Sequence, residues 1–374
     1  MRKEILFSPG PTNVPADILL EGAKRTIHHR TGEFAGILKT LTAPLKKVFG
    51  TDGDVFILTS SGTGAMEAAV ANFVSRDDEV LVLNIGAFGK RWVNILKIHG
   101  LNPEVIEYPW GKTFNLNEVR EKIKNKTYKA VFCQLSETST GTVNDIKSLG
   151  EILPEETLLI VDAVSGLLSD EFQMDNWKVD VCASGSQKGF MMPPGLAFIA
   201  VKKDLEYLKN PSSFYFSLDS AKKSLNKGQT PWTPAVNLLY QLVKSLKMIE
   251  EEGTDNIMKR HKQLAKITRF AVKEMGLELF SSSPSNGVTA VKVPDGIDGT
   301  LMLENISNKY GVRFANGQGE YKGKIFRVAH MGYVNVPDVL MALSCLWLGL
   351  NEAGAKIDSS AIAKTLDSIK NAAI

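Results

Sequence analysis

The chain has 374 residues, of which 44% are hydrophobic, and a formal net charge of +3. Its length and composition predict a large hydrophobic core and two domains. Because the charge is small and scattered, we expect no nucleic-acid partner. No apolar run approaches the roughly 18–20 residues that span a bilayer, and no signal peptide opens the chain. The sequence therefore predicts a soluble cytoplasmic protein without a membrane partner.

The three cysteines, Cys133, Cys182 and Cys345, lie in apolar surroundings without CxxC spacing. This pattern predicts buried free thiols. It predicts neither a disulfide framework nor a metal site.

Strands and helices alternate from residue 54 onward. The turn-rich stretch 8–15 and a predicted helix over 32–49 come first. Seven strands are then predicted over 54–59, 79–84, 104–108, 128–135, 157–161, 179–183 and 195–201. Helices are predicted between the strands. The first ends at residue 74, and the others span 88–99, 116–124 and 146–153. This alternation indicates an α/β fold with a mainly parallel seven-stranded sheet covered on both faces.

The rest of the chain predicts a smaller α+β domain. Long helices are expected over 234–251 and 254–275, and a polar helix over 357–371 closes the chain. Between them lie predicted elements over 287–293, 301–309, 324–329 and 337–350. We expect an N-terminal segment over 1–20, a large domain over 21–252 and a small domain over 253–374.

One lysine, Lys188, stands between runs of small residues that would let a planar group approach the backbone. Its amine could form a Schiff base with a carbonyl, although most lysines are solvated surface charges. Asp162 ends the apolar run 157–161, and open α/β sheets bind their ligands at that edge. A strand-end aspartate and a lysine of this kind are the pair that pyridoxal 5'-phosphate needs.

Four further segments favour an anionic, planar ligand, and each has a plain structural alternative. Residues 60–65 (SSGTGA) could cradle phosphate or simply cap a helix. Phe88, between two glycines, could stack on a ring or belong to the core. Residues 136–141 (SETSTG) could bond a ligand or form a polar turn. Residues 229–234 could bind phosphate or cap the next helix.

Arg327 is a single guanidinium among apolar strand residues. Buried arginines are rare unless they are paired. It could therefore form a structural ion pair or hold a carboxylate with two hydrogen bonds.

These segments together resemble the class V aminotransferases of the pyridoxal-phosphate fold-type I superfamily. The resemblance is greatest to the alanine–glyoxylate and serine–glyoxylate (serine–pyruvate) group and covers essentially the whole chain. It rests on the motifs LFSPGPTNVP at 6–15, HHRTGEF at 28–34, SSGTGAMEA at 60–68, SETSTGT at 136–142, VDAVS at 161–165, SGSQKG at 184–189, TPWTPAV at 230–236 and FRVAHMG at 326–332.

The resemblance implies a role for each matched position. Lys188 and Asp162 would be catalytic, Lys188 carrying the cofactor and Asp162 pairing with its ring nitrogen. Arg327 would hold the substrate carboxylate, with Gly10 in the same pocket. The remaining cofactor-binding residues would be Thr63, Gly64, Ala65, Phe88, Thr138, Val164 and Gln187, with Thr230 and Thr233 reaching the phosphate of the neighbouring subunit in a homodimer.

The implied activity is transfer of an amino group from alanine or serine to glyoxylate or pyruvate by a ping-pong mechanism. Aspartate or 2-aminoethylphosphonate as the donor, or a pyridoxal-phosphate-dependent lyase, is the alternative. Aspartate would need a second cation, for which Arg30, Arg91 and Arg313 are candidates. Desulfurase chemistry is disfavoured, because Gln187 stands where desulfurases have histidine and Cys345 lies in an apolar predicted helix.

Overall fold

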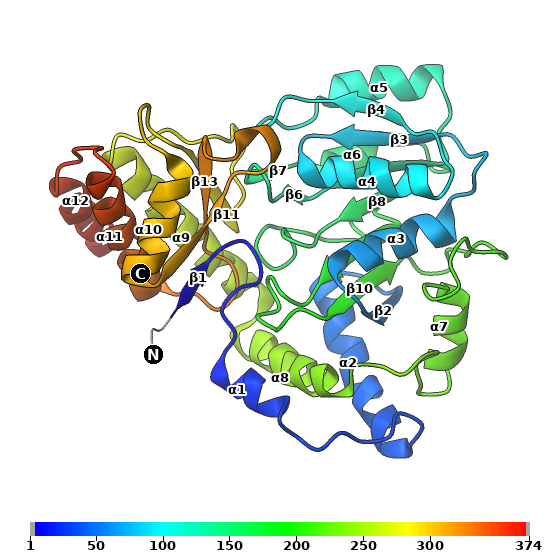
Figure 1. Ribbon diagram of the computed structural model, residues 1–374. Coiled ribbons are helices and arrows are strands. Elements are labelled where there is room, and N and C mark those ends of the chain that lie inside the picture. Colours follow the sequence, from blue (N-terminus) through cyan, green and yellow to red (C-terminus); the bar gives the residue numbers. More distant parts are fainter. Residues whose placement is uncertain (1–3, 372–374) are drawn as a thin grey trace.

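The structure, a computed structural model, describes residues 4–371. Two sheets organise the chain, a large one and a small one, each packed against its own helices (Figure 1). No helix within the described range is long and apolar enough to cross a membrane.

The large sheet has seven strands in the order β2-β10-β9-β8-β5-β3-β4. The five strands from β9 to β4 run parallel, whereas β10 is antiparallel to both of its neighbours. The predicted α/β fold with a mainly parallel seven-stranded sheet is therefore confirmed. The strands are β2 (Asp54–Thr59), β3 (Val80–Asn84), β4 (Glu104–Glu107), β5 (Ala130–Gln134), β8 (Leu158–Asp162), β9 (Val181–Gly185) and β10 (Leu196–Val201).

Both faces of this sheet are buried because its central strands are continuous apolar runs. In β8, Leu159 and Val161 enter the hydrophobic core on one face. Leu158 and Ile160 enter the core on the other face. The side chain of Asp162 follows Leu158 and Ile160 in this alternation, so β8 ends with a carboxyl group on the second face.

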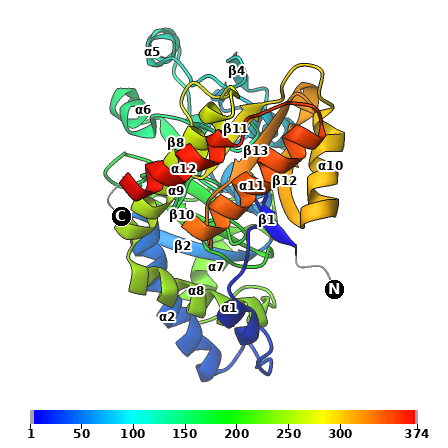
Figure 2. The ribbon, with the colours of Figure 1, turned by 90° about the vertical axis from the view of Figure 1, so that its left-hand side faces the viewer.

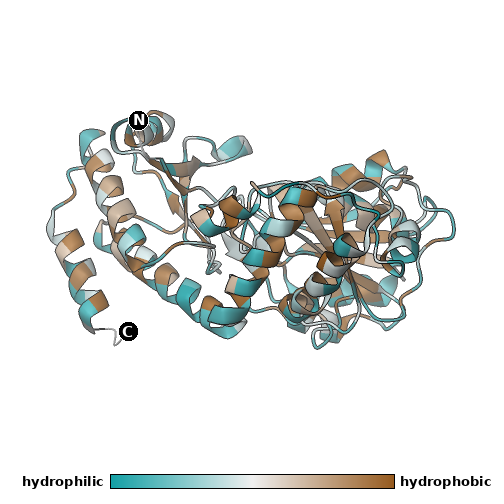
Figure 3. Cartoon of the chain, turned by 90° about the horizontal axis from the view of Figure 1, so that it is seen from below, coloured by the Kyte–Doolittle hydropathy of each residue, from teal (hydrophilic) through white to brown (hydrophobic). Residues whose placement is uncertain are grey.

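Helices on both faces cover the sheet, and those seen from below carry apolar and polar residues side by side (Figure 3). Such amphipathic helices bury one face against the strands. They are α2 (Gly32–Phe49), α3 (Gly62–Phe73), α4 (Ala87–Ile98), α5 (Leu116–Asn125), α6 (Ile146–Ile152), α7 (Leu218–Leu225) and α8 (Val236–Glu252).

The small sheet has the order β1-β12-β13-β11 and packs against the C-terminal helices (Figure 2). Its first strand, β1, comes from the start of the chain and runs parallel to β12. The strands are β1 (Ile5–Phe7), β11 (Val288–Lys292), β12 (Val312–Asn316) and β13 (Ile325–Ala329). The helices are α9 (Thr254–Glu274), α10 (Gly299–Tyr310), α11 (Val336–Glu352) and α12 (Ser360–Asn371).

The strands predicted for the large sheet agree with the structure to within two residues at each end. The sequence did not predict β1, β12, α1 (Ala16–Glu21), α7 or the small hairpin of β6 (Ser136–Glu137) and β7 (Thr142–Val143). One expectation about the cysteines was wrong, because Cys345 is only partly buried, unlike Cys133 and Cys182. The division into domains at residues 20 and 252 stays a prediction.

Candidate active site

Most of the residues predicted to carry chemistry meet at the carboxyl end of the large sheet. A cavity of about 240 Å³ lies there. Parallel strands bring the loops that follow them to one edge, which is where open α/β sheets bind ligands. The cavity is lined by Gly10, Ser61, Gly62, Thr63, Met66, Phe88, Arg91, Thr138, Asp162, Val164, Ser165, Gln187 and Lys188.

Lys188 lies in the turn after β9 and is only 7% exposed. Its amine donates a hydrogen bond to the carbonyl oxygen of Pro9. Burial lowers the pKa of Lys188 to about 7, and the nearby cations Arg327 and Arg91 add to this effect. A substantial fraction of the amine is therefore neutral, and thus nucleophilic, near neutral pH.

The segment before α1 closes the cavity over Lys188. Gly10 lies so close to the lysine side chain that a Cβ atom at this position would overlap it. Thr12 fixes the segment, because its hydroxyl donates to the carbonyl oxygen of Lys188 over 3.2 Å. The predicted place of Gly10 in the pocket thus has a steric reason.

Asp162 ends β8 and is 4% exposed. One carboxylate oxygen, Oδ1, accepts a hydrogen bond of 2.8 Å from the amide of Val164. Burial raises the pKa of Asp162 to about 6, and Lys188 and Arg91 oppose this shift. A buried carboxylate of this kind would be stabilised by a cationic partner.

The N-terminus of α3 opens into the same cavity. Ser61 is the N-cap residue, and its side chain makes no capping hydrogen bond. The first amides of a helix have no partner within the helix, so this end is suited to an anion. Ser61, Gly62 and Thr63 line the cavity, but Gly64 does not, and Ala65 is buried in the apolar core. The structure thus brings Thr63 to the site and places Gly64 and Ala65 behind it.

Phe88 lies in the first turn of α4, half-buried, and faces the cavity. Arg91 lies one turn further along α4, with its guanidinium carbon 4.4 Å from the centre of the Phe88 ring. Its Nη1 donates to the hydroxyl of Thr63 over 2.9 Å. The cavity therefore has a cation at the end where α3 begins.

Thr138, Val164 and Gln187 line the cavity, and their predicted contacts with a cofactor stay a prediction. The hydroxyl of Thr138 is hydrogen-bonded to that of Ser165. Gln187 Oε1 is buried and has no hydrogen-bond partner in the described chain. Val164 packs close to Gly62, where a Cβ atom would come within 2.6 Å of Val164 Cγ2.

Arg327 is 5% exposed and forms no ion pair within residues 4–371. Its Nε and Nη2 donate to the carbonyl oxygen of Asn316 over 3.1 and 2.7 Å, and its Nη1 donates to that of Thr138 over 2.9 Å. Burial lowers the pKa of Arg327 to about 10. Three of the five N–H groups of an arginine are thus used, and two stay available for a carboxylate. Arg327 adjoins the cavity wall through Thr138 rather than lining it.

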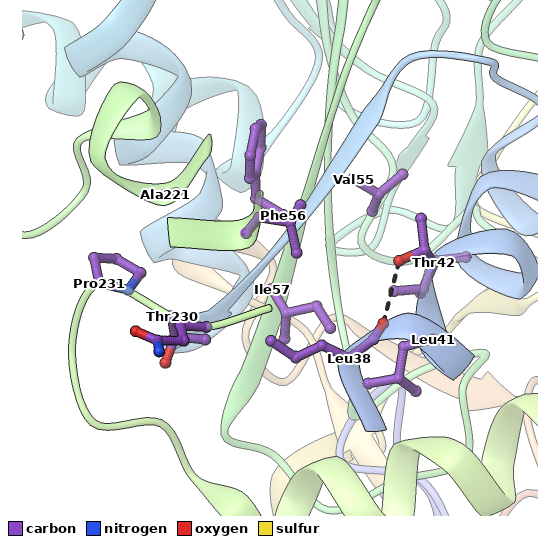
Figure 4. Close-up of a pocket in the computed structure, with 12 residues that line it drawn as sticks. Leu38, Leu41, Thr42, Val55, Phe56, Ile57, Ala221, Thr230 and Pro231 are labelled. Carbon is purple, nitrogen blue, oxygen red and sulfur yellow. Dashed lines mark hydrogen bonds between the residues drawn. The ribbon is translucent and has the colours of Figure 1, made fainter. Parts of the chain in front are cut away.

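Thr230 and Thr233 do not reach the Lys188 cavity of their own chain. Thr230 lies at a separate apolar pocket between α2, β2 and α7 (Figure 4). That pocket leaves only about 30 Å³, room for one or two water molecules. Thr233 is exposed on the surface.

Sequence reasoning missed Ser61, Gly62, Met66 and Ser165 as cavity residues, and considered Arg91 only as a possible substrate cation. Ser61 and Gly62 lie in the predicted phosphate loop, so the position of the helix start was the missing signal. Ser165 follows Asp162 closely in VDAVS. No local pattern identifies Met66 or the orientation of Arg91.

Comparisons with known proteins agree with this geometry. The family model described as aminotransferase class-V matches residues 6–320. An uncharacterized aminotransferase of Methanocaldococcus jannaschii is 40% identical over 96% of this chain and 96% of its own. A serine–glyoxylate aminotransferase of Methylorubrum extorquens is 35% identical over 94% of this chain and 92% of its own. The crystal structure of ureidoglycine–glyoxylate aminotransferase from Bacillus subtilis is 28% identical, with a TM-score of 0.94 over 99% of both chains.

Proposed function

Because the chain belongs to the class V aminotransferases, we propose that it transfers the amino group of alanine or serine to glyoxylate or pyruvate. One observation carries this proposal, namely that a buried lysine with a lowered pKa shares a cavity with a buried strand-end carboxylate. Glyoxylate as the acceptor is supported by the names of two similar proteins, whose donors differ.

Pyridoxal 5'-phosphate is the cofactor that we infer, and the residues present fit it. The uncapped start of α3 and the cation of Arg91 suit a phosphate group. The Phe88 ring and the Val164 side chain offer apolar surfaces for a flat ring. When bound, the cofactor would act as an electron sink for negative charge on the substrate α-carbon.

Within this proposal, the protein binds the phosphate through Ser61, Gly62 and Thr63. This is two residues earlier than the sequence predicted, since Ala65 lies in the core. Thr138 and Ser165 offer hydroxyl groups to the ring oxygen, and Gln187 offers a buried amide.

Lys188 and Asp162 would act on different protons. The Lys188 amine, with a pKa of about 7, can accept a proton from the substrate α-carbon and return it elsewhere. Asp162, when ionised, would hold a proton at the ring nitrogen, because a carboxylate in an apolar site favours a cationic partner.

Arg327 would bind the substrate carboxylate through its two unused N–H groups. The carbonyl oxygens of Asn316 and Thr138 already fix the plane of the guanidinium. A planar group held in this way can accept both oxygens of a carboxylate, as arginine does elsewhere.

A small donor is favoured over aspartate. Of the three candidate cations, only Arg91 lines the cavity. Arg30 donates to Gln229 and to backbone carbonyl oxygens, and Arg313 pairs with Glu4. Because Arg91 bonds Thr63 at the proposed phosphate end, none of the three is left for a distal carboxylate.

A homodimer with shared sites is part of the same proposal. An aromatic cluster, consisting of Phe214, Tyr215 and Trp232, lies beside Thr230 and Thr233. Phe214 is 81% exposed and Tyr215 44%. Aromatic side chains gathered on a surface are typical of protein interfaces, which supports a second copy at this place. A reducing, cytoplasmic location is also proposed, since all three cysteines are free.

The test is an absorption spectrum of the protein loaded with pyridoxal 5'-phosphate. We expect alanine or serine to remove the visible band, and glyoxylate then to restore it with formation of glycine. Lys188→Ala should lose more than about a hundredfold in turnover, the scale of general acid–base catalysis. Lys203→Ala, at an exposed lysine, is the matched control. A spectrum that no amino acid changes would contradict the proposal, and release of pyruvate from serine without an acceptor would indicate a lyase instead.

A further inference from the structure

We propose that Glu137 is a positioning residue of this site. Its buried carboxylate would hold the first turn of α4, and with it Phe88, at the cavity, and would supply the negative charge that Asp162 faces. The inference rests on the proposed function only in taking this cavity as the cofactor site.

The carboxylate of Glu137 is surrounded by donors. Oε2 accepts from the amides of Phe88 over 3.0 Å and Gly89 over 3.1 Å. Oε1 accepts from the amide of Ser139 over 3.1 Å and from its hydroxyl over 2.6 Å. The side chain is 0% exposed. Burial raises the pKa of Glu137, and the hydrogen bonds from Ser139, Gly89 and Phe88 oppose this shift. An ionised carboxylate only accepts hydrogen bonds, so these four donors favour its charged form.

These contacts replace the missing N-cap of α4. The N-cap residue is Gly86, which has no side chain to bond the first amides of the helix. Glu137 bonds the amides of Phe88 and Gly89, and Ser139 Oγ accepts from the amide of Ala87 over 3.1 Å. A Cβ atom on Gly86 would come within 2.6 Å of Glu137 Cγ, so glycine permits this approach. A negative charge at a helix N-terminus is also stabilising.

The same three residues, 137–139, touch the other parts of the site. The carbonyl oxygen of Thr138 accepts from Arg327, and its hydroxyl contacts Ser165. The segment therefore joins the helix that carries Phe88 to the proposed carboxylate-binding arginine. A shift of Glu137 would therefore move the Phe88 ring and also weaken the contact between residues 137–139 and Arg327.

Glu137 also adds negative charge near Asp162, because it follows Gln134, which pairs with Asp162 across the neighbouring strands β5 and β8. Burial is the main cause that raises the pKa of Asp162, and the negative charge of Glu137 raises it further. Arg91 and Lys188 act in the opposite direction. The buried thiols of Cys133 and Cys182 are the other titratable groups beside Asp162, and Arg327 is the cation that faces Glu137.

Glu137→Gln tests both roles, because it removes the negative charge with little change in side-chain size. It also places the NH2 group of glutamine against N–H and O–H donors that the carboxylate accepts from. We expect the Kd for pyridoxal 5'-phosphate to rise at least about tenfold, since a buried donor loses its partner. When binding is measured from pH 5 to 8, the affinity should fall at the acid end, where Asp162 is protonated. We call this fall the acid limb. Without Glu137 the pKa of Asp162 falls, so this acid limb should move to lower pH. The tryptophan fluorescence of the protein reports binding.

Two further variants separate charge from structure. Ser139→Ala removes one donor to Glu137 and the acceptor for Ala87 but keeps the charge. It should weaken binding by a smaller factor and leave the acid limb in place. Glu151→Gln, at an exposed glutamate of α6, should change neither quantity. If Glu137→Gln does not fold, Ser139→Ala still decides whether the cap matters, and a Kd equal to that of the unchanged protein would refute it.

The outcomes distinguish this inference from the proposed function. If the unchanged protein binds pyridoxal 5'-phosphate and Glu137→Gln binds it equally well with the same acid limb, the inference is wrong and the function stands. A weaker Kd at every pH with an unmoved acid limb would overturn the electrostatic role of Glu137. If the unchanged protein does not bind the cofactor, the proposed function fails first.

Discussion

Burial shifts the two central ionisable groups of the cavity in opposite directions. It raises the pKa of Asp162 to about 6 and lowers that of Lys188 to about 7. The pKa of each group is thus close to neutral pH, which makes proton transfer most efficient. The ligand that the site is proposed to bind would stabilise the charges of Asp162 and Lys188.

The lowered pKa of Lys188 predicts how cofactor attachment depends on pH. The neutral amine is the nucleophile, so the rate at which cofactor-free protein gains the visible absorption band should rise from pH 6 to about 8 and then level off. A lysine with an ordinary pKa of roughly 10.4 would keep gaining rate up to pH 10. Stopped-flow absorbance, with a free lysine derivative in solution as the control, checks this, and a continuing rise would contradict the lowered pKa.

Asp162→Asn should make the cofactor-free protein more stable while abolishing transamination. The pKa of Asp162 is raised in the folded state, from 3.8 to about 6, so folding loses stability as pH rises through this window. Such a shift corresponds to roughly 3 kcal/mol at most. The stability gained by Asp162→Asn should therefore be largest above pH 6 and shrink toward pH 4. Urea unfolding at several pH values measures it, and no gain at pH 8 would argue against the raised pKa.

At the scale of elements, two helix N-termini define the cavity, and neither has an N-cap side-chain bond of its own. The start of α3 faces the cavity, where an anion would satisfy it. The start of α4 is satisfied by Glu137 and Ser139. The N-terminal amides of α3 are therefore left for a ligand, whereas those of α4 are bonded by protein side chains.

Gly62→Ala probes the open helix end. The added methyl group would come within 2.6 Å of Val164 Cγ2, so this side chain of the cavity wall would have to shift. Overpacking typically costs about 1–3 kcal/mol, so we expect cofactor affinity to fall roughly tenfold or more. Gly36→Ala, in the middle of α2 with no atom within 4 Å of the new Cβ, should instead stabilise the protein slightly. Fluorescence titration and thermal melting compare the two, and equal cofactor affinity would show that Val164 adjusts freely.

The sequence predicted those elements whose burial pattern is local. The apolar strands β3, β5 and β8 are five-residue runs, and Asp162 stands out at the end of one of them. Strand β1 has three residues and pairs with β12 some 300 positions away, so no local pattern indicated it. Glu137 was visible in SETSTG, but its role depends on amides of α4 that lie 48 and 49 positions upstream.

At the scale of the whole molecule, the exposed aromatic cluster is the proposed contact with a second copy. Phe214→Ser should shift the 41.0 kDa chain from dimer to monomer in sedimentation and weaken cofactor binding, because Thr230 and Thr233 of the neighbouring subunit would be lost. Ile98→Ser is the matched control, since Ile98 at the end of α4 is 82% exposed and Phe214 is 81%. If both variants sediment like the unchanged protein, the cluster is not the interface.

The pairing of β1 with β12 has a consequence for how the protein is made. Ile5–Phe7 is synthesised long before its partner strand, Val312–Phe314. Gly10 and Thr12, which close the cavity over Lys188, come directly after β1. A growing chain therefore completes its large sheet long before the cavity can close. The site can therefore enclose a ligand only after Val312–Phe314 has been made.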